Sequence, residues 1–152
     1  APCSRDSQRS PWMRPQCGLD PPPMEIKLEW SEPGLLRVVW PEEITAEDVA
    51  RFTERHDAMV ELVTRYVIYH ESRGVPGLNA ALRRQLTTWV ERSGTMHAKR
   101  CLGACFVTES PVARTIVTGV WWMISTPYPH SVHERRTDAL RWAHARLAGE
   151  PV

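Results

Sequence analysis

The sequence lacks three features that would assign it to a specialised class: a long apolar run, many cysteines and an excess of one charge. No apolar stretch approaches the roughly 20 residues needed to cross a bilayer, and the first residues lack the apolar core of a signal peptide. The four cysteines are too few and too unevenly placed for a disulfide-stapled secreted fold. We therefore expect a cytoplasmic protein with free thiols and no membrane partner.

Positive and negative side chains are balanced, with 19 lysines and arginines against 18 aspartates and glutamates. Without the first 23 residues, 16 of each sign remain. A neutral chain has no field that gathers polyanions, so we expect no nucleic-acid partner. Apolar residues make up 42% and charged residues 24%, which is the usual globular mixture and is enough to build one core.

The segment 1–23 differs in composition from the rest of the chain. It contains six of the 13 prolines, among them Pro21-Pro22-Pro23, and few aliphatic residues. Such a segment has little to bury, which predicts a flexible or polyproline-like tail. Patterned sequence begins at Met24, so the tail is interpreted either as an upstream-start artefact or as a linker, with Trp12 as a weaker candidate anchor for a partner. We place the folded domain at residues 24–152.

The patterned sequence opens with a predicted β-hairpin. Residues 26–30 and 35–40 alternate along the chain with the period of two that is typical of half-buried strands, and Pro33-Gly34 supplies a turn between them. Thr45 and Asp48 then form a variant capping box at the start of a long amphipathic helix.

Strands and helices alternate along the rest of the chain. We predict strands at 66–69, 101–107 and 131–134, and helices that begin after Asn79, after Ser110 and at Thr137. The helix after Asn79 is expected to end at Gly94. In the helix after Ser110, the side chains expected to face inward are Val112, Ile116, Val120, Trp121 and Ile124. The order ββαβαβαβα predicts an α/β domain with a mixed, mostly parallel sheet, an N-terminal hairpin and about four helices.

Cysteine and histidine spacings do not predict a metal or catalytic site. Cys101 and Cys105 lie four residues apart on a predicted strand, a separation of roughly 13 Å, whereas zinc ligands meet at one ion. His130 and His133 have too few companions unless His97 or Asp138 joins them. His56, on the apolar stripe of the first helix, is interpreted as a half-buried packing residue. We therefore assign no catalytic residue, no metal and no cofactor.

Two features suggest contact surfaces instead. The segment 74–79 joins a predicted strand to a predicted helix, where α/β folds often place ligand sites, but it matches no phosphate-binding or dinucleotide motif. Trp121 and Trp122 are about 100° apart on one helix, so one of them is expected to be partly exposed. Trp122 is a candidate partner contact, and packing against another element is the alternative.

The chain resembles the STAS or SpoIIAA-like family known from anti-sigma factor antagonists. The resemblance is carried by the element order and by local phrases between Glu25 and Leu147. These phrases are Leu35–Trp40 with the acidic turn 41–45, Tyr66–Tyr69 with the loop 74–79, Cys101–Val107 with Ser110-Pro111-Val112, and Ala139-Leu140-Arg141-Trp142. The resemblance implies a STAS-like sandwich and a non-enzymatic role in protein interaction.

The sequence departs from that family at its regulatory site. Antagonists of this kind carry an Asp-Ser pair before the second helix, and phosphorylation of the serine switches partner binding. Here residues 76–80 contain no serine or threonine, and Ser72 does not match the motif position.

We predict a non-enzymatic regulatory module that binds a protein partner through Leu78, Asn79, Arg83 and Trp122. The alternatives are a small-molecule or lipid sensor and an unrecognised enzyme, which would show a pocket with convergent titratable groups.

Overall fold

The computed structural model describes residues 25–74 and 77–150, which form a five-stranded sheet and four helices. The tail 1–23, Met24, Val75 and Pro76 lie outside these residues, as do Pro151 and Val152. The strands are β1 (Lys27–Glu32), β2 (Leu35–Trp40), β3 (Tyr66–Ser72), β4 (Cys101–Val107) and β5 (His130–His133). The helices are α1 (Ala46–Glu61), α2 (Ala80–Arg100), α3 (Pro111–Met123) and α4 (Arg136–Ala148). The predicted order ββαβαβαβα is confirmed.

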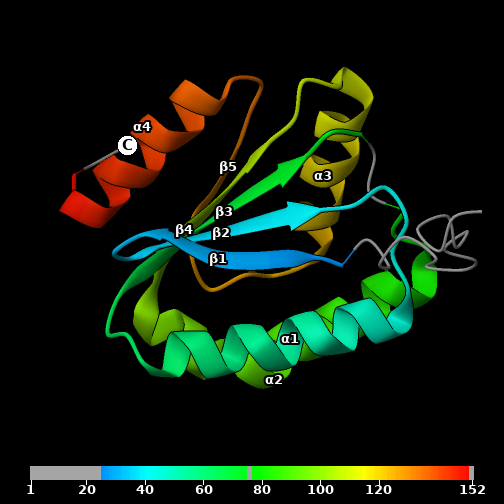
Figure 1. The fold of residues 1–152 in the computed structure, drawn as a ribbon, viewed down its shortest axis with the longest axis horizontal. Helices are drawn as coiled ribbons and strands as arrows, with labels where there is room; N and C mark the ends of the chain where they lie inside the picture. The colour runs from blue at the N-terminus through cyan, green and yellow to red at the C-terminus, as the bar shows by residue number, and fades with distance from the viewer. Residues whose placement is uncertain (1–24, 75–76, 151–152) are drawn as a thin grey trace, which may run out of the picture.

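The sheet has the order β1-β2-β3-β4-β5, in which β1 pairs antiparallel with β2 and all other pairs are parallel (Figure 1). Gly34 takes the turn between β1 and β2 with φ +82°, a left-handed conformation that glycine adopts without steric cost. The mixed, mostly parallel sheet with an N-terminal hairpin is therefore confirmed.

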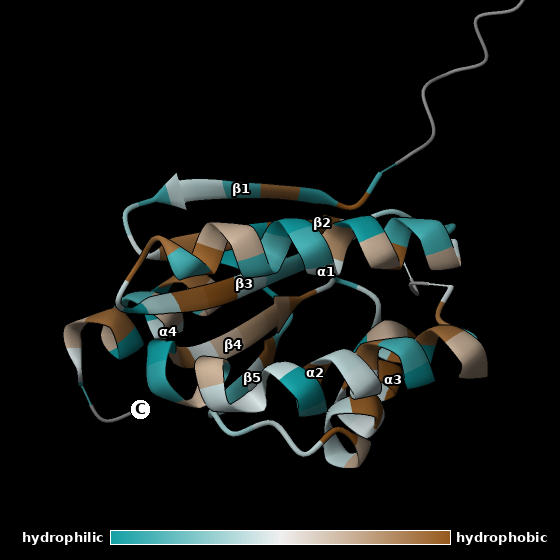
Figure 2. Cartoon of the chain, turned by 90° about the horizontal axis from the view of Figure 1, so that it is seen from below, coloured by the Kyte–Doolittle hydropathy of each residue, from teal (hydrophilic) through white to brown (hydrophobic). Residues whose placement is uncertain are grey.

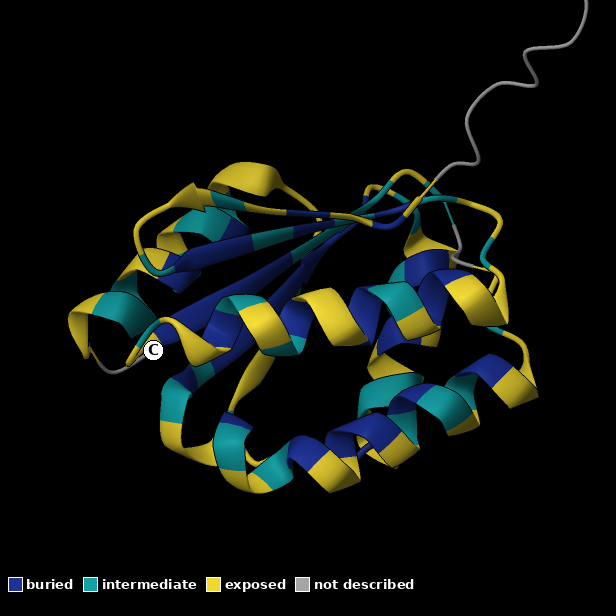
Figure 3. Cartoon of the chain, turned by 60° about the horizontal axis from the view of Figure 1, so that its bottom comes forward, coloured by how far each residue is buried: buried dark blue, intermediate teal, exposed yellow. Residues whose placement is uncertain are grey.

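The two faces of the sheet are covered unequally. Alternate side chains of β2, β3 and β4 pack with α1, α2 and α3 in the larger core, which includes Leu36, Ile68 and Phe106. The opposite face packs against α4 in a smaller core built around Val67 and Cys105 (Figure 1). Figure 2 shows apolar residues along the strands, and Figure 3 shows buried residues alternating with exposed ones along the helices. Residues 25–74 and 77–150 include no helix with both the length and the apolar character needed to span a membrane.

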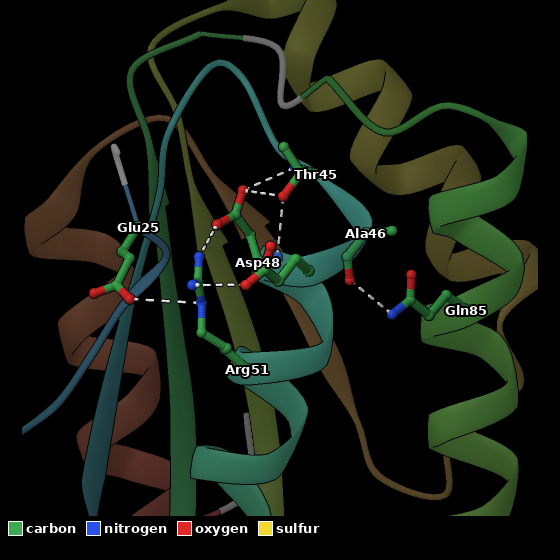
Figure 4. Close-up of polar contacts among 7 residues, drawn as sticks. Glu25, Thr45, Ala46, Asp48, Arg51 and Gln85 are labelled. Atoms are coloured by element: carbon green, nitrogen blue, oxygen red, sulfur yellow. Dashed lines mark hydrogen bonds and ion pairs between the residues drawn. The ribbon is translucent and has the colours of Figure 1, made fainter. Parts of the chain in front are cut away.

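A polar network fixes the start of α1, as Figure 4 shows. The Thr45 hydroxyl accepts from the Asp48 backbone N–H at 3.1 Å, and the Asp48 carboxylate accepts from the Thr45 backbone N–H at 2.9 Å, so the predicted capping box is present. Arg51 pairs with Asp48 at 2.8 Å, and the Gln85 side chain donates to the Ala46 carbonyl at 3.0 Å. The last bond ties the beginning of α1 to α2.

Two details of the predicted helices are wrong. Gly94 does not end α2, which continues to Arg100 and leads directly into β4. The intrahelical hydrogen bonds and apolar contacts of the last turns outweigh the modest helix penalty of one glycine. In α3, Ile124 is buried and Val120 and Trp121 are partly buried as expected, but Val112 and Ile116 face solvent. The buried side of α3 instead contains the small Ala113 together with Val117. This helix contacts β5, the edge strand of the sheet.

Two glycines test this packing in opposite directions. A Cβ at Gly103 would lie 2.7 Å from Trp142 Cη2 and 3.1 Å from the Pro129 carbonyl oxygen, whereas a Cβ at Gly94 meets nothing within 4 Å. We expect Gly103→Ala to lower the free energy of unfolding by about 1–3 kcal/mol because of overpacking. Gly94→Ala should raise it by about 0.5–1 kcal/mol. Urea denaturation measures both, and a stable Gly103→Ala protein would contradict the close contact of β4 with α4.

Candidate functional site

The predicted contact residues at the start of α2 each have a structural partner. The Asn79 side chain caps α2 by accepting from the Leu82 backbone N–H at 2.9 Å. The Arg83 guanidinium donates to the Leu78 carbonyl at 3.2 Å, and the Leu78 side chain packs on the larger core. The structure therefore brings Leu78, Asn79 and Arg83 together at one rim, where they stabilise the helix start.

The described part of the preceding loop is held against the loop between β2 and α1. The Gly77 backbone N–H donates to the Glu42 carbonyl at 3.0 Å, and a Cβ at Gly77 would lie 2.9 Å from that oxygen. Ser72 is also engaged, since its hydroxyl donates to the Gly74 carbonyl. A glycine is required where the two backbones approach this closely.

Trp122 lies away from this rim, on α3. It is 83% exposed, and three more apolar side chains of α3 are exposed with it: Met123 at 69%, Val112 at 63% and Ile116 at 40%. Positions 112, 116 and 123 fall within about 40° of one another around the helix, so they form one stripe beside Trp122. We call Val112, Ile116, Trp122 and Met123 the α3 stripe. Trp121, as expected, is the more buried of the two tryptophans.

The exposed face of α3 is also uncharged. Its exposed residues are Pro111, Val112, Thr115, Ile116, Thr118, Gly119, Trp122 and Met123. The single charged residue of α3, Arg114, is half-buried and donates to the carbonyls of Thr108 and Glu109 at 3.0 and 3.2 Å. By contrast, the exposed face of α1 includes Glu47, Glu54, Arg55 and Glu61.

A hollow at the carboxyl ends of the strands, on the α4 side, is filled by an ion-pair network. Arg37 bridges Glu29 at 2.8 Å and Glu71 at 2.6 Å, and Arg136 approaches Glu71 at 3.5 Å. Burial opposes ionisation of Glu71, but its neighbours Arg37, Tyr69 and Arg136 together outweigh burial and lower the pKa of that carboxyl. Arg37, Glu71 and Arg136 are therefore engaged with one another, while Lys27, Arg73 and Glu109 also line the hollow.

An internal cavity of about 80 Å³ lies between the sheet and the helices. Its walls combine aliphatic and aromatic side chains and include Trp40, Trp89, Trp121 and His70. Ligand pockets for drug-sized molecules usually measure about 300–1,000 Å³, so this cavity is too small for a lipid chain. The Trp40 indole N–H donates to His70 Nδ1 at 3.0 Å, and burial, with a smaller contribution from His56, lowers the pKa of His70 to about 3.

The cysteine pair and the histidine pair that were considered as metal ligands do not meet at one point. The pairing of β3 with β4 shifts in register between Tyr66 and Val67. As a result, Cys101 lies in the larger core and Cys105 in the smaller one, on opposite faces of the sheet. His133 Nε2 lies 2.8 Å from the Ser131 hydroxyl, and among the described residues no carboxylate bonds its ring. His130 packs edge-on against Trp121, with ring centroids 4.7 Å apart. His97 does not join His130 and His133, because it packs against His56 instead.

The sequence analysis missed a polar cluster beneath α1 and α2. His56 and His97 are fully buried with ring centroids 5.1 Å apart, and the Asp57 carboxylate lies 3.5 Å from His56 Nδ1. His56 was predicted to be a half-buried packing residue, but it is 0% exposed. The members come from two different helices with no fixed spacing between them, so a motif search could not join them. The available signal was that His56 and His97 each occupy the apolar side of a helix.

The described residues therefore form the fold class that the resemblance implied, a mixed α/β domain with five strands and four helices. No protein-family model and no curated protein matches the chain. A similar solved structure is an uncharacterised protein of the DUF3478 family, with a SpoIIAA-like fold, from Shewanella loihica PV-4. It is 20% identical, the match covers 78% of this chain and 91% of that one, and the TM-score is 0.48.

The capping role of Asn79 generates a first prediction for this region. Asn79→Ala removes the bond to the Leu82 N–H and should lower the free energy of unfolding by about 1 kcal/mol. Asn79→Asp keeps an acceptor and should be close to neutral. Thermal unfolding of the two variants measures the difference, and equal loss in both would contradict a capping role.

His70 generates a prediction on pH. Its folded pKa of about 3 lies below the unfolded value of about 6.5, so the unfolded chain binds the extra proton between these values. Stability is therefore complete above about pH 6.5 and falls as the pH drops toward 3, by about 1.4 kcal/mol per pH unit for this group. His70→Gln keeps an acceptor for Trp40 but cannot be protonated, so its urea-derived stability should fall less steeply between pH 6.5 and 5. Identical slopes for both proteins would contradict the lowered pKa of His70.

Proposed function

We propose that this chain is a non-enzymatic regulatory module that binds a protein partner through the α3 stripe. The observation that carries the proposal is the uncharged, apolar exposed face of α3, with Trp122 at 83% exposure. Exposed tryptophan is enriched at the energetic centres of protein interfaces, and contiguous exposed apolar side chains mark interaction sites. The predicted rim of Leu78, Asn79 and Arg83 is a second candidate surface.

The charge of the surface favours a protein over a membrane or a polyanion. A helix that lies on a membrane normally has a polar face rich in lysine and arginine, and nucleic-acid binders need clustered positive charge. The exposed residues of α3 supply neither. An apolar groove or helix on another protein fits an uncharged stripe, because no charge is left without a partner when the surfaces join.

Two features of the described interior favour a binding role over serine–histidine catalysis and over lipid sensing. The Ser131–His133 contact lacks an orienting carboxylate within the described part of the chain, which leaves it without the third group of a serine–histidine triad. The cavity of about 80 Å³ is too small for a lipid chain. Cys101 and Cys105 are free, which supports the cytoplasm as the site of action.

A photo-crosslinking amino acid placed at Thr115, beside the stripe, tests the proposal in cells of the source organism. We expect one protein to be crosslinked reproducibly, and its capture to be lost when Trp122→Glu or Ile116→Glu is added. Both positions are exposed, so their effect on stability should stay within roughly 0.5 kcal/mol.

The control is Leu62→Glu, which changes an apolar side chain that is 87% exposed at the end of α1. It should leave capture intact. Asn79→Asp adds a charge at the rim while keeping the helix cap. Loss of capture in Asn79→Asp but not in Trp122→Glu would move the contact to the rim and overturn the α3 proposal. Crosslinking to a second copy of this chain alone would also overturn it.

A further inference from the structure

The buried histidines of α1 and α2 are packed closely with aromatic rings. His56 and His97 lie at 0% and 1% exposure, and each stands edge-on to Trp89, with centroids 4.9 and 5.1 Å from that ring. Tyr66, the first residue of β3, closes the cluster from the sheet. Two imidazoles in so apolar a setting require an explanation, because each carries two nitrogen atoms that need hydrogen-bond or metal partners when buried.

One nitrogen of each ring has no hydrogen-bond partner. His97 Nδ1 is bonded to the Tyr66 hydroxyl at 2.7 Å, and His56 Nδ1 approaches Asp57 Oδ1 at 3.5 Å. Both Nε2 atoms are buried and without a hydrogen-bond partner among the described residues. Buried polar atoms in native proteins nearly always find a partner, so an unpaired one requires an explanation such as a bound water, an ion or a functional role.

We propose that His56, Asp57 and His97 bind a divalent transition-metal ion, with Zn²⁺ the best fit. Each residue offers one ligand atom, and the three atoms lie within 4.8 Å of one another. Imidazole nitrogen and carboxylate oxygen are zinc ligands, and tetrahedral bonds of about 2.0–2.1 Å place ligands roughly 3.4 Å apart. Small side-chain rotations would close the cluster onto an ion, and the fourth position would be taken by water.

The surrounding residues fit the outer shell of a metal site. The Trp89 indole N–H donates to both Asp57 oxygens, at 3.0 and 3.2 Å, and fixes the plane of the carboxylate. The Tyr66 hydroxyl is bonded to His97 Nδ1, which leaves Nε2 as the ring nitrogen that can bind an ion. Partners of this kind orient metal ligands and raise their affinity.

An entry path reaches the cluster from solvent. Asp57 is partly exposed and lies in a groove between α1 and α2, together with Glu54, Glu61 and Arg92. The two glutamates are exposed and lie on α1, so they attract a cation toward Asp57. The histidines supply the buried end of the site and the carboxylate its solvent side.

The test is a Zn²⁺ titration of the untagged full chain against a chromophoric chelator, followed by Co²⁺ absorption spectroscopy. We expect one ion per chain with a dissociation constant of about micromolar or tighter, and an intense visible Co²⁺ band typical of tetrahedral coordination. Asp57→Asn should weaken binding at least tenfold and abolish the rise in melting temperature that Zn²⁺ causes in the unmodified protein. His97→Gln should behave in the same way.

Matched variants separate this site from other ligands of the chain. His144→Gln replaces an exposed histidine on α4 and should leave affinity unchanged. The double variant Cys3→Ser/Cys17→Ser removes the thiols of the tail and should also bind normally. If His97→Gln does not fold, Asp57→Asn decides, because Asp57 is only partly buried. The proposal is overturned if the unmodified protein binds no ion, if Asp57→Asn binds as tightly as His144→Gln, or if the double cysteine variant loses binding.

Discussion

The hydrogen bond between the Tyr66 hydroxyl and His97 Nδ1 fixes the arrangement on the side of the sheet that α1, α2 and α3 cover. It joins the first residue of β3 to the last turn of α2 at 2.7 Å, within a fully buried region. Each group would be costly to bury alone, so each depends on the other. The Arg100 guanidinium adds a second tie by donating to the Val60 carbonyl at the end of α1, at 2.9 Å.

These ties set where β4 begins, because α2 runs into it without a loop. Cys101 pairs with Tyr66, and the next paired residues are Val67 and Gly103. The additional residue, Leu102, shifts the alternation of side chains, so that Cys101 belongs to the larger core and Leu102 packs with the smaller one. The irregularity therefore gives both cores an apolar side chain at the point where α2 meets the sheet.

The sequence allowed most of the fold to be predicted, because its signals are local. The alternation in 35–40, the capping box at Thr45 and the caps Asn79 and Ser110 each depend on residues within a few positions of one another, and each is present. The end of α2 was mispredicted because it is set by distant contacts of His97 and Arg100, which outweigh the weak preference of Gly94. The histidine cluster was missed for the same reason, since His56 and His97 meet only when α1 and α2 pack on β3.

The α3 stripe is not explained by folding of the described residues. The inward side of α3 already supplies Ala113, Val117 and Ile124 to the core, so the exposed side chains of Val112 and Ile116 add nothing to it. A polar exterior would serve stability and solubility equally well, as the charged exterior of α1 does. Four large apolar side chains left in water on one short helix carry a cost in aggregation. The partner that we propose would cover these side chains and remove that cost.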